Sequence, residues 1–269
     1  MNRMPEFAYI KINLENQVAD IRLSRPDKLN ALSLGLMEDI ISAAKWANDN
    51  SEVRCVVLSG EGRGFCAGID MEALKNNADG TFADLIKRTH GNTNFFQQVV
   101  WVWRECRVPV IAAIHGAAIG GGFQLALGAD IRIVHPKSKM SIMEMKWGLI
   151  PDMAGTALMC HLASEDIVRE LTYTARVFDG QKAKDYGFAT HVSETPFEDA
   201  MTLALEITGN NPDAVVASKR LFNDIADFQA DDILMNESVL QSDVIMAPNQ
   251  IEAVKAGFEK RRPVFKDAS

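Results

Sequence analysis

Two short stretches near the start of the chain, residues 10–14 and 19–23, alternate hydrophobic and polar side chains. A period of two is typical of strands with one buried face, so the pattern predicts a β-hairpin. After a polar break, Ser33 stands where its hydroxyl can cap a helix. That helix would carry its apolar side chains on one face, namely Leu36, Met37, Ile40, Ile41 and Ala44.

Nearly continuous apolar runs follow at residues 53–58, 108–114 and 131–134. Such runs indicate strands that are buried on both faces, and a shorter strand is expected at 140–142. Helices are expected between and after these strands, over most of residues 71–104, over about 122–127, and over most of the chain from 154 onward, with late starts at Pro212 and Pro248.

The strand and helix patterns alternate up to about residue 195, and no clear strand pattern follows. This alternation argues for an α/β fold. We therefore expect an α/β core domain that holds the active site over residues 1–195, and a helical C-terminal region over 196–269. A chain of 269 residues buries enough surface to fold without a disulfide or metal staple.

Composition and charge restrict the partners of this chain. It has 28 basic and 36 acidic residues, a net charge of −8, and 47% hydrophobic residues. An acidic chain repels nucleic-acid phosphates and anionic membranes, so neither is an expected partner. The most apolar region, residues 108–134, contains polar residues and a glycine cluster, and it does not predict a membrane span. Because no signal-peptide pattern is found at the start, we expect a cytoplasmic protein.

The cysteines and histidines predict neither disulfides nor a metal centre. No CxxC pair occurs, and no histidine has ligand partners at metal-binding spacing, so no metal is expected. Cys66 lies in a glycine-rich turn, but the sequence supplies no base that would make it a nucleophile. The residues interpreted as buried free thiols are Cys55, Cys66, Cys106 and Cys160.

Two of the predicted strands end in glycine-rich turns, at residues 62–68 and 116–122. Glycine allows close backbone approach, and the free N–H groups of such a turn suit an anion or a developing oxyanion. A phosphate-binding P-loop is excluded because Gly122 is followed by Phe123 and Gln124 instead of Lys and Ser or Thr. A dinucleotide fingerprint fits poorly because the first turn is one residue too long. Tight packing of a helix on a strand remains the structural alternative.

Five segments, in this order along the chain, resemble the enoyl-CoA hydratase/isomerase (crotonase) family. The resemblance implies a crotonase fold of repeated ββα spiral units with a helical C-terminal trimerisation region. It also implies a homotrimer or a dimer of trimers. The segments are residues 25–32, the turn 64–70, the run 111–131 with its three consecutive glycines, the loop 148–151, and the C-terminal 259–267.

The resemblance implies an acyl-CoA thioester as the substrate, with coenzyme A as part of that substrate and no separate cofactor. The thioester oxygen would accept hydrogen bonds from the backbone N–H groups of Ile69 and Gly121. Such donors stabilise the negative charge of an enolate more than they stabilise the ground state. By the same resemblance the coenzyme A moiety would be bordered by Lys28, Asn30, Ala67, Gly68, Asp70 and Lys260, the last of which would reach it from the same or a neighbouring subunit.

The carboxylates distinguish between the reactions of the family. Its hydratases use two glutamates, one corresponding to Glu144 and the other to Gln124 of this chain. Glutamine cannot serve as a catalytic acid or base, so this pattern departs from that of a hydratase. Dienoyl-CoA isomerases of the family carry a glutamate and an aspartate at the positions of Glu144 and Asp152. Δ3,Δ2-enoyl-CoA isomerases use a glutamate at the position of Glu144.

We therefore expect an isomerase in which Glu144 carries the proton. Asp152 would be a second base or would orient Glu144 or a water, and Gln124 would hydrogen-bond a water or the substrate. A base near neutral pH needs a raised pKa, which burial supplies. The apolar residues expected to bury Glu144 are Met143, Met145, Trp147 and Ile150.

Three alternatives remain open. Glu144 and Asp152 could together hydrate an enoyl-CoA. Gln124 could instead mark a non-catalytic protein that only binds acyl-CoA. Asp152 could simply cap a helix that starts near Ala154.

Overall fold

The computed structural model describes residues 5–70, 85–224 and 247–267. A six-stranded sheet has the order β1-β2-β3-β4-β6-β8, and a separate two-stranded sheet pairs β5 with β7. β1 and β2 form the expected antiparallel hairpin, while the other neighbouring strands run parallel. The strands span β1 Ile10–Glu15, β2 Val18–Leu23, β3 Cys55–Gly60, β4 Val110–Ile114, β5 Ala117–Ile119, β6 Ile131–Val134, β7 Lys139–Ser141 and β8 His191–Val192.

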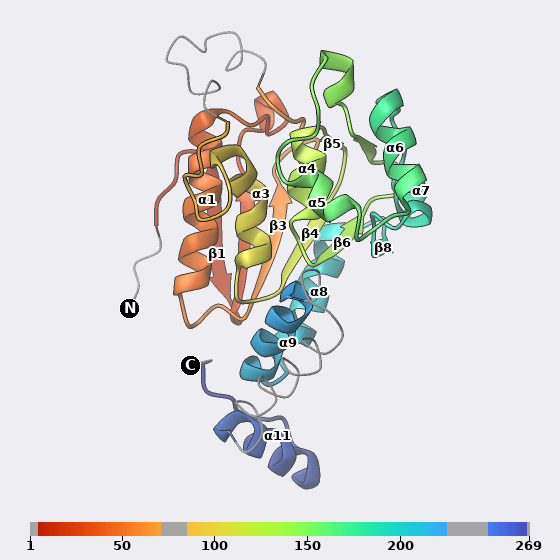
Figure 1. Cartoon of the computed structure of the whole chain (residues 1–269). Coiled ribbons are helices and arrows are strands. Elements are labelled where there is room, and N and C mark those ends of the chain that lie inside the picture. Colours follow the sequence, from red (N-terminus) through yellow and green to blue (C-terminus); the bar gives the residue numbers. More distant parts are fainter. Residues whose placement is uncertain (1–4, 71–84, 225–246, 268–269) are drawn as a thin grey trace.

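The helices connect these strands and continue beyond them (Figure 1). The cap predicted at Ser33 is confirmed, since its hydroxyl accepts a hydrogen bond from the N–H of Leu36 at 3.3 Å. The helical elements are η1 Pro26–Lys28, α1 Leu34–Asp49, α3 Phe95–Glu105, α4 Gly121–Leu127, η2 Glu144–Trp147, α5 Gly155–Met159, α6 Glu165–Thr174, α7 Gly180–Tyr186, α8 Pro196–Thr208, α9 Pro212–Asp224 and α11 Pro248–Glu259.

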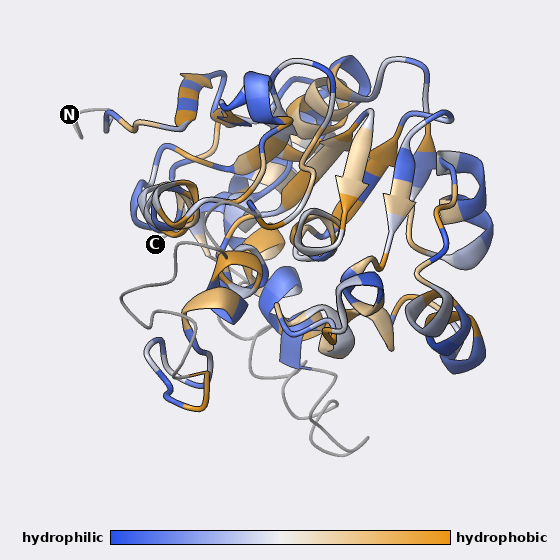
Figure 2. Cartoon of the chain, turned by 90° about the horizontal axis from the view of Figure 1, so that it is seen from above, coloured by the Kyte–Doolittle hydropathy of each residue, from blue (hydrophilic) through white to orange (hydrophobic). Residues whose placement is uncertain are grey.

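The six-stranded sheet is buried on both faces, as the apolar runs predict. Val56 and Leu58 of β3 belong to the large core with α1, α3 and α4. The alternate residue Val57 points to the other face, where it packs with Ala200 and Ala204 of α8. Figure 2 shows the hydrophobic strands at the centre, with more polar segments among the helices around them. α8 thus covers one face of the sheet. It does so although it belongs to residues 196–269, which were predicted to form the helical C-terminal region that follows the α/β core.

Three expectations about local structure need correction. Residues 85–94 are not helical, and the helix expected over most of 71–104 is seen only as α3, while 71–84 lie outside the described residues. Residues 117–119 form a strand that the glycine-rich pattern did not predict. Cys160 is exposed instead of buried, because it lies at the end of the short helix α5. No helix in the described ranges has the length and apolar character needed to cross a membrane.

Candidate active site

The two glycine-rich turns, which are about fifty residues apart in the sequence, are held against each other by backbone hydrogen bonds. The N–H of Cys66 donates to the carbonyl of Ala117 at 2.8 Å, and the N–H of Ile119 donates to the carbonyl of Cys66 at 3.0 Å. β3 and β4 are paired parallel neighbours, so the turns that follow their carboxyl ends leave the same edge of the sheet. The tertiary structure therefore brings together the two bends that carry Ile69 and Gly121.

Glycine is required where these turns cross. Gly68 has a φ of +91°, and a Cβ added to it would lie 2.6 Å from the carbonyl oxygen of Ile119. At Gly122 an added Cβ would lie 2.2 Å from the carbonyl oxygen of Cys66. Both close contacts are with backbone atoms, which cannot move aside as a flexible side chain could. These two glycines are therefore needed for the close packing of one turn against the other, which is compatible with a binding role.

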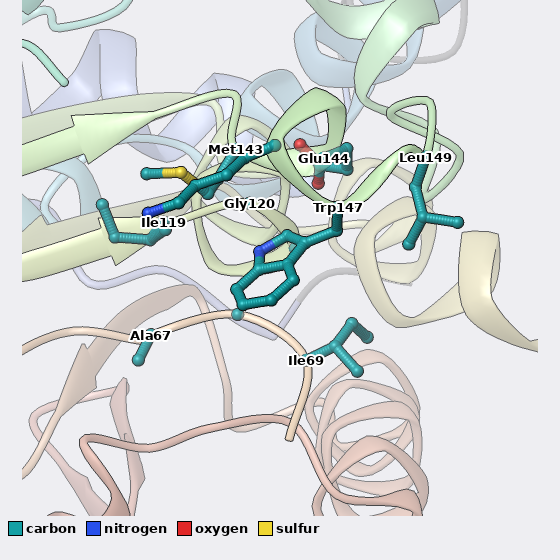
Figure 3. Close-up of a pocket in the computed structure, with 11 residues that line it drawn as sticks. Ala67, Ile69, Ile119, Gly120, Met143, Glu144, Trp147 and Leu149 are labelled. Atoms are coloured by element: carbon teal, nitrogen blue, oxygen red, sulfur yellow. The ribbon is translucent and has the colours of Figure 1, made fainter. Parts of the chain in front are cut away.

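A cavity of about 280 Å³ opens where the turns meet η2. Figure 3 shows Ala67 and Ile69 on one side of it, Met143 and Glu144 on the other, and the Trp147 ring between them. Four residues predicted for the site from the two turns are in its wall, together with the predicted base. The lining residues are Ala67, Gly68, Ile69, Ile119, Gly120, Gly121, Met143, Glu144, Lys146, Trp147 and Leu149.

Ile69 and Gly121, whose backbone N–H groups are predicted to bind the thioester oxygen, both line this cavity. Within the part of the chain that the structure describes, the N–H of Ile69 and the N–H of Gly121 donate to no backbone or side-chain acceptor. The Ile69 side chain also approaches the other turn, since a Cβ on Gly121 would lie 3.8 Å from Ile69 Cδ1. Backbone N–H groups without an acceptor, on two residues that line one cavity, are available to bind a carbonyl oxygen and stabilise it as an oxyanion.

Glu144 is the carboxylate among the described residues that line the cavity. Its Oε1 accepts a hydrogen bond of 2.6 Å from Gln124 Nε2, and its Oε2 is buried without a partner in the described residues. Burial raises the pKa of Glu144 above its ordinary value, and the negative charge of Asp152 raises it further. The direction of this shift is the one expected of a base that works near neutral pH.

Two of the four residues predicted to bury Glu144 are largely exposed. Trp147 is 55% exposed and Ile150 is 69% exposed, so neither encloses the carboxylate. The protein approaches it instead from the side of the second turn and α4. A Cβ on Gly120 would lie 3.3 Å from Glu144 Oε1, and Gln124 contacts the same oxygen from α4.

Gln124 is fully buried and does not contribute to the cavity wall. Its Oε1 accepts hydrogen bonds from the N–H groups of Met153 and Gly155, at 2.9 and 3.0 Å. Its Nε2 donates to Glu144. The expected contact between this amide and a water or the substrate is therefore replaced by contacts with Glu144 and the following loop.

Asp152 lies beside the catalytic candidate but outside the cavity wall. α5 has Ala154 at its N-cap position with no side-chain cap hydrogen bond, so the interpretation of Asp152 as that helix cap is wrong. The residue is exposed, yet partial desolvation raises the pKa of its carboxyl. Its charge is close enough to raise the pKa of Glu144.

Two of the residues expected to border coenzyme A have side chains that hold the fold together. Asn30 is fully buried, and its amide donates to the carbonyls of Glu61 and Gly64, both at 2.9 Å. Asp70 forms an ion pair of 3.0 Å with Arg25. These side chains fix the two segments in place, which leaves any contact with coenzyme A to the backbone or to neighbouring residues.

The other expected coenzyme A contacts lie in different places. Ala67 and Gly68 line the cavity, and Lys28 is exposed at the end of η1. Lys260 directly follows α11, which Figure 1 shows at the end of the molecule opposite β5 and α4. The fold of one chain therefore does not bring Lys260 to its own cavity.

Three residues of the cavity wall were not predicted from the sequence. Ile119, Lys146 and Leu149 line the cavity, and only their position beside the glycine turn or Glu144 could have signalled it.

The Cys66 thiol is buried, which raises its pKa to about 12 and excludes a thiolate nucleophile. No group of His, Cys, Asp and Glu side chains among the described residues could hold a metal ion.

Comparisons with known proteins agree with this geometry. A family model described as "Enoyl-CoA hydratase/isomerase" matches residues 13–268. The chain is 28% identical to a mitochondrial Δ(3,5)-Δ(2,4)-dienoyl-CoA isomerase of Dictyostelium discoideum, covering 98% of this chain and 93% of that protein. It is 31% identical to a peroxisomal enzyme of the same name from Arabidopsis thaliana, covering 95% of each.

A solved structure shows the same architecture. The crystal structure of an enoyl-CoA hydratase from Bacillus anthracis superposes with a TM-score of 0.89 at 29% identity. The match covers 96% of this chain and 99% of that one. The α/β crotonase fold is thereby confirmed.

Proposed function

This chain belongs to the enoyl-CoA hydratase/isomerase family, and we propose that it shifts a double bond within the acyl group of an enoyl-CoA. The reaction would be that of a Δ3,Δ2-enoyl-CoA or dienoyl-CoA isomerase. The observation that carries the proposal is that Glu144 is the one carboxylate among the described residues of a cavity that Ile69 and Gly121 also line. Two of the relatives described above are named as dienoyl-CoA isomerases.

The first step is removal of a proton from C2 of the acyl group. The N–H groups of Ile69 and Gly121 bind the thioester oxygen, on which negative charge develops as Glu144 takes the proton. Because these donors are part of the folded backbone, they need no reorganisation when the charge appears. The electron pair of the broken C–H bond is delocalised through the enolate towards the double bond between C3 and C4.

In the second step the proton returns to the far end of the conjugated system. A 3-enoyl-CoA takes it at C4, and its double bond then lies between C2 and C3. A 3,5-dienoyl-CoA takes it at C6, and its double bonds then begin at C2 and C4. The carboxylic acid of Glu144 gives back the proton that it took, so no atom is gained or lost. One carboxyl group can therefore complete the cycle, whereas hydration must also orient a water and add it to C3. Isomerisation therefore suits a site in which Gln124 stands where hydratases of the family have a second glutamate.

Hydration remains the second candidate because Asp152 lies close enough to affect the ionisation of Glu144. In that case Asp152 would orient or activate the water. A protein that only binds acyl-CoA is the third candidate, and it would leave the raised pKa of Glu144 without a use. The first two candidates require the same two oxyanion donors.

The wider setting of the reaction is also a proposal. Ala67 and Gly68 would contact the pantetheine end of the substrate from the cavity wall, beside Lys28 and the backbone near Asn30. Lys260 would reach coenzyme A only from a neighbouring subunit, which fits a trimer or a dimer of trimers. A cytoplasmic location stays a prediction, while the two named relatives are a mitochondrial and a peroxisomal protein.

A panel of acyl-CoA esters tests the reaction. We expect the purified protein to convert 3-enoyl-CoA to 2-enoyl-CoA, or 3,5-dienoyl-CoA to 2,4-dienoyl-CoA, and to exchange C2 protons with deuterated water. Chromatography and mass spectrometry measure both products. Faster conversion of 2-enoyl-CoA to the 3-hydroxy product would make it a hydratase, and binding without any exchange would make it non-catalytic.

The pH dependence tests the role of Asp152. Replacing Asp152 with Asn removes a negative charge that raises the pKa of Glu144. Since the base acts in its ionised form, the acidic limb of kcat/KM should move to lower pH, while the plateau changes little. Steady-state kinetics from pH 4 to 9 measure both quantities.

A distant aspartate provides the matched control for this variant. Asp185 is exposed on α7, and Asp185→Asn should leave the acidic limb in place. A loss of kcat at every pH in Asp152→Asn would instead show that Asp152 itself transfers a proton or orients a water. That outcome would favour the hydratase candidate.

A further inference from the structure

The orientation of the Gln124 amide is fixed by hydrogen bonds to the backbone. Its oxygen faces two N–H donors, those of Met153 and Gly155, which a terminal NH₂ group could not satisfy. The NH₂ group must therefore point the other way, to Glu144 Oε1 at 2.6 Å. A backbone segment about thirty residues away thus determines which end of this amide meets the carboxylate.

The structure around the amide leaves it no other orientation. Gln124 has no exposed surface, and an added Cβ on Gly155 would lie 2.4 Å from its Oε1. Ala154, between the two donors, has a φ of +62°, in the left-handed region that non-glycine residues rarely adopt. The loop adopts a strained backbone conformation where its N–H groups converge on the side chain.

The hydrogen bond from Gln124 orients the Glu144 carboxylate. One of its oxygens, Oε1, is held by a donor, which fixes the rotation of the group about its last side-chain bond. Oε2 has no partner among the described residues. A carboxylate fixed at one oxygen only is pre-oriented and still has an unused acceptor.

We propose that Gln124 is a positioning residue that holds the Glu144 carboxylate in one rotation and in its proton-accepting state, with its own orientation set by residues 153–155. The inference deepens the proposed function and rests on it for the role of Glu144 as base. Gln124 itself touches no part of the cavity, so it acts only through Glu144.

The charges around Glu144 show why a neutral donor matters there. Burial and the charge of Asp152 both raise the pKa of Glu144, whereas the hydrogen bond from Gln124 lowers it. Among the residues that the structure describes, Lys146 is the basic one that lines the same cavity. An amide donor thus opposes burial without adding a second group that could take the proton.

Gln124→Glu separates the two functions of the side chain. A carboxylate at this position can still accept from Met153 and Gly155, but in its ionised form it offers an acceptor to Glu144. Two carboxyl groups at hydrogen-bond distance compete for one proton, which raises the pKa of the pair. We expect the acidic limb of kcat/KM to move up by at least one pH unit, about a tenfold loss of kcat/KM below the midpoint.

A titration without substrate makes the inference independent of the reaction. In protein labelled with ¹³C at the glutamate carboxyls, the Glu144 signal is assigned by its absence in Glu144→Gln. We expect Glu144 to titrate at higher pH in Gln124→Glu than in the wild type. If the acyl-CoA panel fails but this shift is seen, the positioning stands while the proposed reaction does not.

Gly155→Ala is the second variant, which leaves residue 124 unchanged. Its Cβ crowds Gln124 Oε1 and should weaken the donor contact, giving a smaller shift in the same direction. If both variants lower the melting temperature but leave the titration and the acidic limb unchanged, Gln124 is only structural and the inference is wrong. If Gln124→Glu does not fold, Gly155→Ala decides by the same two measurements.

Discussion

Glu144→Gln is expected to lower the rate of C2 proton removal by about 10²- to 10⁴-fold, the usual contribution of a positioned acid or base. Gln keeps the shape of the side chain and can still accept from Gln124 Nε2, so acyl-CoA binding should change little. The loss should therefore appear in kcat and in deuterium exchange, with KM nearly unchanged. Single-turnover kinetics with the best ester of the panel measure the chemical step directly.

The same variant should not destabilise the protein at neutral pH. Because burial raises the pKa of Glu144 in the folded state, the folded protein binds this proton more tightly than the unfolded chain. Its contribution to stability is therefore full below the unfolded pKa and is lost as the pH rises through the folded pKa. Gln has no such loss, so the free energy of unfolding of Glu144→Gln should rise relative to that of the wild type as the pH increases above the ordinary pKa of a glutamate, about 4.

Denaturant unfolding at several pH values checks this second effect. Asp185→Asn, which alters an exposed carboxylate on α7, is the control for the general effect of one less charge. Full activity of Glu144→Gln would exclude Glu144 as the base. A variant that is inactive because its fold is destabilised would show a lower melting temperature at every pH.

Gly68→Ala should lower kcat/KM by about 10²- to 10³-fold, the loss that follows removal of one oxyanion donor. The new Cβ would lie 2.6 Å from the carbonyl of Ile119 and 3.6 Å from the nitrogen of Gly121. Both turns must then move apart, which displaces the N–H groups of Ile69 and Gly121. Overpacking against the backbone should also cost about 1–3 kcal/mol of stability. Kinetics and thermal unfolding measure the two effects.

Gly91→Ala is the matched control for backbone strain. Gly91 also has a positive φ, +59°, but an added Cβ would meet nothing within 4 Å, and the residue does not line the cavity. It should lose about 1–2 kcal/mol of stability from the left-handed conformation alone, with kcat/KM unchanged. Equal activity of the two variants would show that the contact between the turns does not hold the donors in place.

The sequence determined the elements whose causes are local. Alternation in 10–14 and 19–23 predicted the hairpin, and apolar runs predicted β3, β4 and β6, because burial of a strand leaves a periodic pattern. Ser33 identified the start of α1 by its own hydrogen bond to the backbone. The family resemblance identified Glu144 and the two glycine turns, and the cavity brings these together.

Only the tertiary structure decided what each polar side chain contacts. Asn30 and Asp70 were expected near coenzyme A, but their partners are backbone carbonyls and an arginine distant in the sequence. Cys160 follows an apolar pair and yet is exposed, because α5 ends there. A short segment does not show which of its faces the rest of the chain will cover.

Gln124 shows most clearly what the sequence alone could not determine. The sequence determined that a neutral amide stands where hydratases of the family have a glutamate, and so excluded proton transfer by that side chain. It did not determine that the amide would face Glu144, because this depends on two N–H groups about thirty residues further along the chain. Hydrogen-bond satisfaction in a buried site is a property of all the groups that meet there, and they meet only in the folded chain.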